Sequence, residues 1–149
     1  MDRWDIVDIV QRMQDYVEAH LQDPITLSDL ARAAGYSQWH AARVFRELTG
    51  KAPFEYVRAL RLTRAALLLR DEQPKIVDVA FDFVFASHEG FTRAFSKQFG
   101  VSPVDYRRNP KPIRLFMPDR ARDRYLKLQK GEIEMAADEA ATTLFVQVV

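Results

Sequence analysis

Apolar side chains recur every three or four positions along most of this chain, the spacing that gathers them on one face of an α-helix. The first such run covers residues 3–22, carries charges on its other face and stops before Pro24. We therefore expect a first helix there, packed on the elements that follow. Four later helices are indicated by apolar stripes of their own, which consist of Leu27, Leu30, Ala31 and Ala34, then Ala41, Val44, Phe45 and Leu48, then Ile76, Val79, Ala80 and Phe83, and finally Phe91, Ala94, Phe95 and Phe99.

A longer helix is predicted between Pro53 and Glu72, at the centre of this series. Gly50 supplies a stop for the preceding helix, and proline at a first helical position has a backbone angle already suited to a helix. Leu, Ala and Arg, which are strong helix formers, dominate the interior of the segment. The rest of the chain is organised on either side of this helix.

The segments before and after the central helix are copies of one another. A shift of 50 positions aligns Arg43 with Arg93, Phe45 with Phe95, Gly50 with Gly100, Pro53 with Pro103, Tyr56 with Tyr106, and Arg58 with Arg108. Further upstream, a shift of 49 positions aligns Leu27 with Ile76, Leu30 with Val79, Ala31 with Ala80, and Tyr36 with Phe85. An internal repeat of this kind indicates a duplicated structural unit. We expect two small helical units, at residues 25–50 and 75–108, joined by the helix at residues 53–72.

Local signals within the repeat indicate two short helices joined by a tight turn. Thr26 and Asp29 have the spacing of a capping box, and Gly35 supplies the positive φ that a tight turn needs. Ser37 and Ser87 can cap the second helix of each unit. Two short helices that are joined by a glycine-containing turn, the second with a polar outer face, are the helix-turn-helix pattern.

The chain changes character after Asn109. Three prolines in the nine residues 110–118 exclude a regular helix and predict a linker on the surface. Residues 119–130 favour a short charged helix, whereas the β-branched and apolar run 142–149 is typical of a strand. Because a lone strand needs a partner, we expect this strand to be the first of a further domain that the chain enters and does not complete.

The expected fold class is therefore all-α, with two helix-turn-helix subdomains joined by a long central helix and an irregular C-terminal tail that ends in a β-strand. Residues 1–108 would form the helix-turn-helix domain, residues 109–141 a linker, and residues 142–149 the start of the further domain.

Composition excludes several classes of function. The 149 residues contain no Cys, which removes disulfides, thiolate nucleophiles and Cys-based zinc sites. The three His have no metal-binding spacing, and there is no P-loop and no catalytic triad, so we expect neither an enzyme nor a metal or cofactor. The chain has no run of 18 apolar residues and no basic-then-apolar leader, so we expect no membrane insertion and a cytoplasmic protein.

The distribution of charge is more informative than the net charge of +1. Residues 1–24 sum to −4, residues 25–108 to +4 and residues 109–149 to +1. The repeat region is therefore basic, and the acidic part of the chain is the first predicted helix. This distribution is compatible with a nucleic-acid partner for the repeats.

Residues 25–108 resemble the DNA-binding domain of the AraC/XylS family of bacterial transcription regulators. GYSQWHAARVFRELTG is similar to a first recognition-helix segment of that family, and FTRAFSKQFGVSPVDYRR to its C-terminal signature. The resemblance covers 84 of 149 residues. It implies a transcription regulator, either an activator or a repressor, whose two recognition helices enter successive major grooves of double-stranded DNA, about 34 Å apart. It also implies operator or promoter DNA and RNA polymerase as partners.

The tail carries a second resemblance. RNPKPIRLF, YLKLQKGE and TLFVQVV are similar to the junction in family members whose DNA-binding domain precedes a gyrase-inhibitor-like effector-binding domain. This resemblance implies that residues 145–149 begin such a domain. It also implies a small-molecule effector that acts through the part absent from this chain.

The outward faces of the two second helices carry the candidate DNA contacts, which are Gln38, Trp39, Arg43, Arg46, Ser87, His88, Glu89, Thr92, Arg93 and Lys97. Arg43 and Arg93 occupy equivalent positions and either bind DNA, through guanine O6 and N7 or through phosphate, or lie in surface ion pairs. Trp39 packs either against a thymine methyl group or onto the neighbouring helix. Arg46 and Lys97, one turn further on, are expected at phosphates.

Three positions depart from the family pattern. Val84 stands where the second turn usually has glycine, so this turn either adopts another conformation or stores strain of about 1–3 kcal/mol. Ala42 takes the place of a polar base-contacting residue, and Glu89 puts an acid on the DNA-facing surface, where it either accepts a hydrogen bond from cytosine N4 or repels phosphate. These departures and the low net charge leave an alternative open, a helical protein–protein interaction module without DNA specificity.

Overall fold

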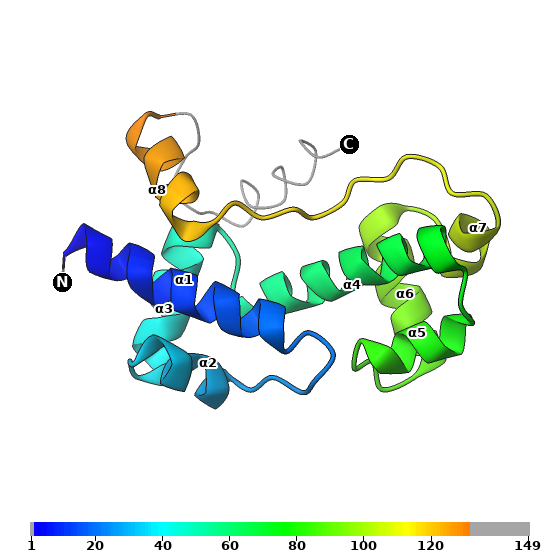
Figure 1. The fold of residues 1–149 in the computed structure, drawn as a ribbon, viewed down its shortest axis with the longest axis horizontal. Coiled ribbons are helices and arrows are strands. Elements are labelled where there is room, and N and C mark those ends of the chain that lie inside the picture. The colour runs from blue at the N-terminus through cyan, green and yellow to red at the C-terminus, as the bar shows by residue number, and fades with distance from the viewer. Residues whose placement is uncertain (1, 132–149) are drawn as a thin grey trace. The chain divides into compact units, whose positions relative to one another are not determined.

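The computed structural model describes residues 2–131, and over this range every regular element is an α-helix (Figure 1). The helices are α1 (Arg3–Ala19), α2 (Leu27–Ala34), α3 (Gln38–Thr49), α4 (Pro53–Glu72), α5 (Ile76–Asp82), α6 (His88–Phe99), α7 (Pro103–Arg108) and α8 (Ala121–Gln129). The predicted all-α class and the long helix at residues 53–72 are confirmed. None of the described helices is long and apolar enough to cross a membrane.

The described chain divides into two compact units. The first unit contains α1, α2, α3, residues 53–57 of α4, and α8. The second unit contains the rest of α4 together with α5, α6 and α7. Each unit holds one pair of short helices, as the internal repeat predicts.

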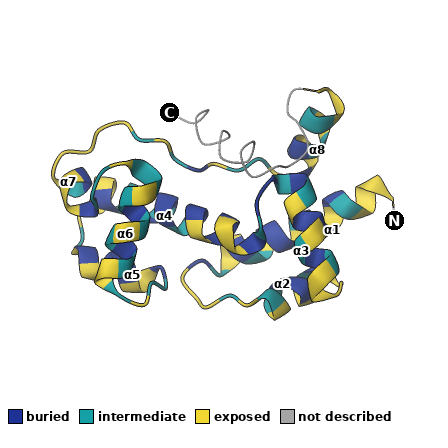
Figure 2. Cartoon of the chain, turned by 180° about the vertical axis from the view of Figure 1, so that it is seen from behind, coloured by how far each residue is buried: buried dark blue, intermediate teal, exposed yellow. Residues whose placement is uncertain are grey.

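The first unit buries the apolar stripes that the sequence pattern predicts (Figure 2). The buried residues of α3 are the four predicted ones, Ala41, Val44, Phe45 and Leu48. Thr26 and Asp29 form the predicted capping box at the start of α2, and Gly35 ends that helix with a φ of +73°. The polar positions of α3 are turned outward because its apolar positions are buried.

The helix α1 ends earlier than the sequence pattern predicts, at Ala19 and not at residue 22. The amide of His20 donates to the carbonyl of Val17, which is one residue short of the helical partner. The imidazole of His20 stacks on Tyr16, with ring centroids 4.0 Å apart, and its Nδ1 lies 2.8 Å from the Tyr16 carbonyl. The imidazole therefore contacts the Tyr16 carbonyl, which would accept the backbone hydrogen bond of His20 if the helix continued.

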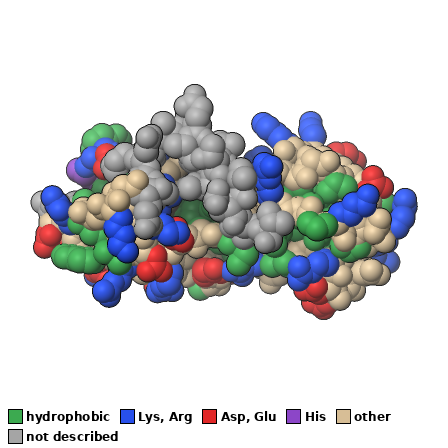
Figure 3. All heavy atoms as spheres, turned by 90° about the horizontal axis from the view of Figure 1, so that it is seen from above, with side chains coloured by type: hydrophobic (Ala, Val, Ile, Leu, Met, Phe, Trp, Pro, Cys, Tyr) green, Lys and Arg blue, Asp and Glu red, His purple; other side chains and the backbone are tan. Residues whose placement is uncertain are grey.

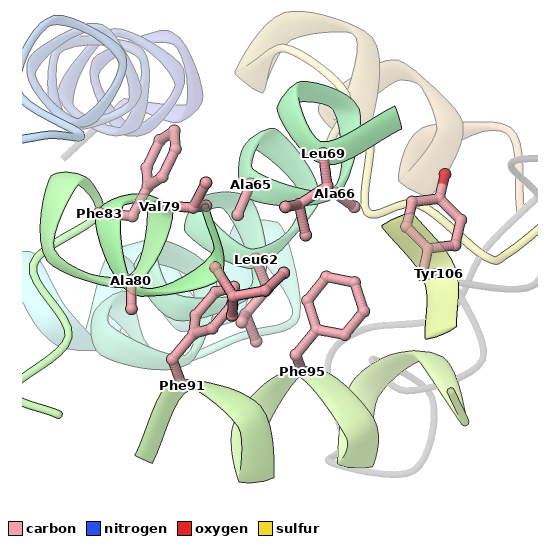
Figure 4. Packing of buried hydrophobic residues seen from close by; sticks show 11 residues of the cluster. Leu62, Ala65, Ala66, Leu69, Val79, Ala80, Phe83, Phe91, Phe95 and Tyr106 are labelled. Carbon is pink, nitrogen blue, oxygen red and sulfur yellow. The ribbon is translucent and has the colours of Figure 1, made fainter. Parts of the chain in front are cut away.

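The core of the second unit consists of aromatic side chains of α6 packed against small and branched residues of α4 and α5 (Figure 4). Phe91 and Phe95 are fully buried, and their rings point from α6 toward α4. The other members of this cluster are Leu62, Ala65, Ala66, Leu69, Ile76, Val79, Ala80, Phe83 and Tyr106. Burial of each phenylalanine ring contributes about 1.5–3 kcal/mol, so these two residues hold α6 firmly in place.

The segment after α7, predicted to be a linker on the surface, is anchored to the second unit by part of its length. Its prolines keep residues 110–120 out of helical structure, but Phe116 is buried and its amide donates to Oγ1 of Thr63 at 2.9 Å. Ile113 and Leu115 are partly buried against the core of the second unit. The short charged helix predicted next is α8, and the strand predicted for residues 142–149 lies outside the described residues.

The turn at Val84 has the same left-handed conformation as its counterpart at Gly35. The angle φ is +66° at Val84 and +73° at Gly35. The amide of Phe85 donates to the carbonyl of Ala80 at 2.9 Å, and the equivalent atoms of the first turn are 3.1 Å apart. Of the two alternatives for this turn, the structure therefore selects the strained one, with a β-branched residue in a region that suits glycine.

Val84→Gly should raise the free energy of unfolding by about 0.5–1 kcal/mol. Relief of strain of about 1–3 kcal/mol outweighs both the flexibility that glycine adds to the unfolded chain and the loss of a half-buried side chain. Urea denaturation followed by circular dichroism measures the change. Gly35→Val is the matched reverse change and should lower stability by about 1–3 kcal/mol, because an added Cβ at Gly35 meets no atom within 4 Å and only the backbone conformation opposes it. Destabilisation by Val84→Gly would show that the strain energy at Val84 is smaller than the stabilisation that its side chain gains from packing.

Candidate nucleic-acid interface

Capping and packing together fix the orientation of α3. The hydroxyl of Ser37 accepts a hydrogen bond from the amide of His40 at 3.3 Å, and Phe45 packs edge-on against Tyr56 of α4, with ring centroids 4.9 Å apart. The face opposite this packing is polar and open to solvent. The predicted contacts on that face are all exposed, namely Gln38, Trp39, Arg43 and Arg46.

Arg43 lies between two side chains of its own helix. Its guanidinium carbon is 5.2 Å from the centroid of the Trp39 ring, and its Nη1 is 2.9 Å from Oε1 of Glu47. The surface ion pair considered for Arg43 is therefore present. An exposed pair of this kind contributes about 0.3–0.5 kcal/mol, whereas a bidentate contact with guanine contributes about 1–3 kcal/mol. The ion pair therefore does not prevent Arg43 from binding a base.

Trp39 is 68% exposed. Its ring meets the ring of His40 edge-on, with centroids 5.0 Å apart, and its other described ring contact is with Arg43. Trp39 therefore points into solvent, and although Arg43 lies over its ring, most of the indole surface remains accessible to a ligand. Tryptophan combines a large apolar area with few rotatable bonds, which suits it to an interface.

The helix α6 is built in the same way. The hydroxyl of Ser87 accepts a hydrogen bond from the amide of Gly90 at 3.0 Å, and a Cβ at Gly90 would lie 3.0 Å from that hydroxyl oxygen. Glycine therefore allows the cap to approach closely. Gln98, near the other end of α6, donates from its amide to the carbonyl of Ala59 at 3.2 Å.

The outward face of α6 carries the second set of predicted contacts. His88, Glu89, Arg93 and Lys97 are exposed, while Ser87 and Thr92 are half-buried. Arg93, the repeat equivalent of Arg43, has no acidic partner among the residues that the structure describes, in contrast to the Arg43–Glu47 pair. The two helices therefore present equivalent arginines in different electrostatic settings.

The charged surface around these helices is mixed. The face of the molecule drawn in Figure 3 carries basic side chains with acidic side chains among them. Glu47 stands among the outward residues of α3, and Glu89 among those of α6. A surface of this kind attracts phosphate moderately, so selectivity depends on individual side chains more than on the overall field.

Sequence reasoning missed two residues that act on α3. Glu47 lies four positions after Arg43, a spacing that brings two side chains together on a helix, so their pairing could have been predicted. Arg124 donates from α8 to the carbonyl of Leu48 at 2.8 Å, across 76 positions of the chain. No local pattern indicates that second contact.

Two capped helices of one repeat, each with an exposed arginine at the same position, define a double helix-turn-helix domain. Residues 30–109 match the model of a helix-turn-helix domain family. The chain is 42% identical over 107 residues to the right origin-binding protein of Escherichia coli strain K12, over 72% of this chain and 37% of that protein. It is 35% identical over 99 residues to the regulatory protein SoxS of Salmonella typhimurium strain LT2, over 66% of this chain and 92% of SoxS.

The fold is also that of solved DNA-binding domains. The DNA-binding domain of the global transcriptional factor AdpA, determined in complex with a target DNA, has a TM-score of 0.64 and 29% identity, over 70% of this chain and 99% of that domain. The chain belongs to the AraC/XylS family of DNA-binding transcription regulators. It spans about a third of the length of the right origin-binding protein, 37%.

Glu47→Gln should raise the affinity of the chain for DNA by about twofold to fivefold, because Arg43 no longer has to leave an ion pair and one negative charge is removed from the face of α3. Fluorescence anisotropy with a labelled duplex measures the affinity. Asp8→Asn is the matched control, since it removes the same charge from an exposed ion pair at 2.7 Å with Arg12 on α1. An equal gain from both variants would show that the effect is one of overall charge and not of Arg43.

Proposed function

We propose that this chain is a sequence-specific regulator of transcription that inserts α3 and α6 into successive major grooves of double-stranded DNA. The observation that carries the proposal is the pair of N-capped helices with exposed arginines at equivalent positions, Arg43 and Arg93. An α-helix fits the major groove, and half-elements one helical turn apart lie on the same side of a duplex. Membership of the AraC/XylS family supports the same function.

Each outward side chain has a role in this proposal. Arg43 and Arg93 donate to O6 and N7 of guanine, and Trp39 covers a thymine methyl group. Arg46 and Lys97 bind phosphates and position the helices. The other contacts, to bases or to phosphates, come from Gln38, Ser87, His88, Glu89 and Thr92.

The two half-elements are expected to contribute unequally. To bind a base, Arg43 must break its ion pair with Glu47. Arg93 has no such ion pair with any of the described residues, so its contact with a base carries no such cost. The half-buried Ala42 also leaves α3 with one polar reader fewer. The half-element bound by α6 should therefore be the more strongly selected of the two.

The wider regulatory setting follows from the family. Binding at a promoter would bring RNA polymerase within reach, and an effector-binding domain after α8 would add a small-molecule input. We place this activity in the cytoplasm, where the DNA is. The overlap with 37% of one relative and 92% of another supports a DNA-binding part that occurs both with and without a large partner domain.

Selection from a pool of duplexes with random inserts of about 20 base pairs, followed by anisotropy titrations at two salt concentrations, tests the proposal. One enriched motif with two half-elements about 10 base pairs apart is expected. Arg43→Ala and Arg93→Ala should each weaken binding by about 1–3 kcal/mol and relax the preference at one half-element only.

Arg12→Ala removes an exposed arginine from α1 and should leave the selected motif unchanged. Salt-dependent binding without an enriched motif would reduce the chain to a non-specific DNA-binding protein. Absence of binding at low salt would contradict the proposal and leave the alternative, a helical protein–protein interaction module.

A further inference from the structure

The helix α8 lies outside residues 30–109, which match the family model, yet it packs on both α1 and α3 of the first unit (Figure 1). Two polar side chains lie in this contact, Arg124 of α8 and Gln14 of α1, and each is only 5% exposed. Polar groups buried to this extent are costly unless every hydrogen bond is made. The groups that form hydrogen bonds with Arg124 and Gln14 therefore show which helices this contact holds in position.

Arg124 caps α3 from outside the helix. Its Nε donates to the carbonyl of Leu48, in the last turn of α3, at 2.8 Å. The last carbonyls of a helix lack partners within the helix, and a cation there is favourable toward the helix dipole. Burial lowers the pKa of the Arg124 guanidinium, and the carboxylate of Asp119 counteracts part of this effect.

Gln14 holds the beginning of α8. Its Oε1 accepts from the amide of Ala121 at 2.9 Å, and its Nε2 donates to the carbonyl of Asp119 at 2.9 Å and to the hydroxyl of Tyr56 at 3.2 Å. The N-cap residue of α8, Arg120, makes no side-chain cap of its own. The Ala121 amide also donates to Oε1 of Gln11 at 3.0 Å, so two glutamines of α1 supply part of the capping that the sequence of α8 lacks.

Arg124 meets α3 directly at the Leu48 carbonyl, whereas Gln14 reaches α3 through Tyr56. Tyr56 packs edge-on against Phe45, and Leu48 lies one turn further along the same buried face. Release of α8 would leave the Leu48 carbonyl without the Arg124 guanidinium, and the Gln14 side chain without the backbone groups of Asp119 and Ala121, so α8 and α3 are coupled in position. Arg43 projects from the opposite face of the same helix.

We propose that Arg124 and Gln14 are positioning residues for DNA readout by the first unit. They fix α3 in the orientation in which Arg43 meets its base, without contacting DNA themselves. The inference rests on the proposed function, since it assigns α3 and α6 one half-element each.

Arg124→Met tests the inference, because methionine is also a long side chain but lacks the donors and the charge. Its affinity for the selected duplex should fall about tenfold, with base preference lost at the α3 half-element and kept at the α6 half-element. The dependence on salt should stay as in the wild-type chain, since no phosphate contact is removed. Arg124→Lys, which keeps the charge and a donor, should recover most of the affinity, and Gln14→Leu should show the same half-element pattern as Arg124→Met.

Arg122→Met is the matched control. Arg122 is exposed on the same helix, 6.0 Å from the ring centroid of Trp4, and its loss should change affinity by less than about twofold. A double-mutant cycle supplies a readout that mere loss of stability would not give. Arg124→Met and Arg43→Ala should be non-additive, while Arg124→Met and Arg93→Ala should be additive.

Equal loss at both half-elements, additivity with Arg43→Ala, or the same loss from Arg122→Met would overturn the inference. An Arg124→Met chain that circular dichroism shows to be unfolded would also count against the inference. A positioning role requires that the variant still folds and binds DNA with an altered base preference. A wild-type chain without any sequence preference would refute the proposed function itself. A wild-type chain that selects its motif, beside an Arg124→Met chain that reads both half-elements as before, would refute this inference alone.

Discussion

Burial of one face of each reading helix is the constraint on which the rest of this domain depends. Phe45 in α3, and Phe91 and Phe95 in α6, take their places in the cores of their units. Because successive residues of an α-helix are about 100° apart, fixing the apolar face also fixes which side chains point outward. The candidate DNA contacts are therefore the complement of the core, and a change in core packing would turn them away from their ligand.

The turns show how much local strain this burial can tolerate. Val84 keeps the left-handed conformation of the glycine at the equivalent position, although a β-branched residue is poorly suited to it. The cost, about 1–3 kcal/mol, is comparable to the burial of a single phenylalanine and smaller than that of two. The flanking helices α5 and α6 bury several such groups, so the turn conformation follows from packing more than from its own residue.

In the proposed function, the overall charge of the repeat region and the individual side chains of α3 and α6 play different parts. The charge attracts DNA, and the side chains select its sequence. Under this proposal, a region with a charge of +4 and acidic residues on both outward helix faces would attract DNA only moderately. In the proposed function, selection depends on a few donors on α3 and α6, whose orientation follows from core packing, from the ion pair of Arg43 with Glu47, and from the contact of Arg124 with the end of α3. In this arrangement the orientation of a helix matters more than the number of its charges.

The sequence by itself determined the helices, their caps and the outward residues of α3 and α6, because apolar periodicity and capping act between residues four or fewer positions apart. It also determined the duplication, because the two copies keep the same residue types at matching positions. Only the tertiary structure decided the burial of Phe116 against Thr63 and the contact of Arg124 with Leu48. These two contacts join residues 53 and 76 positions apart. Partners this far apart in the chain meet only because folding brings their surfaces together. A pattern that repeats every three or four residues does not indicate which distant surfaces will meet.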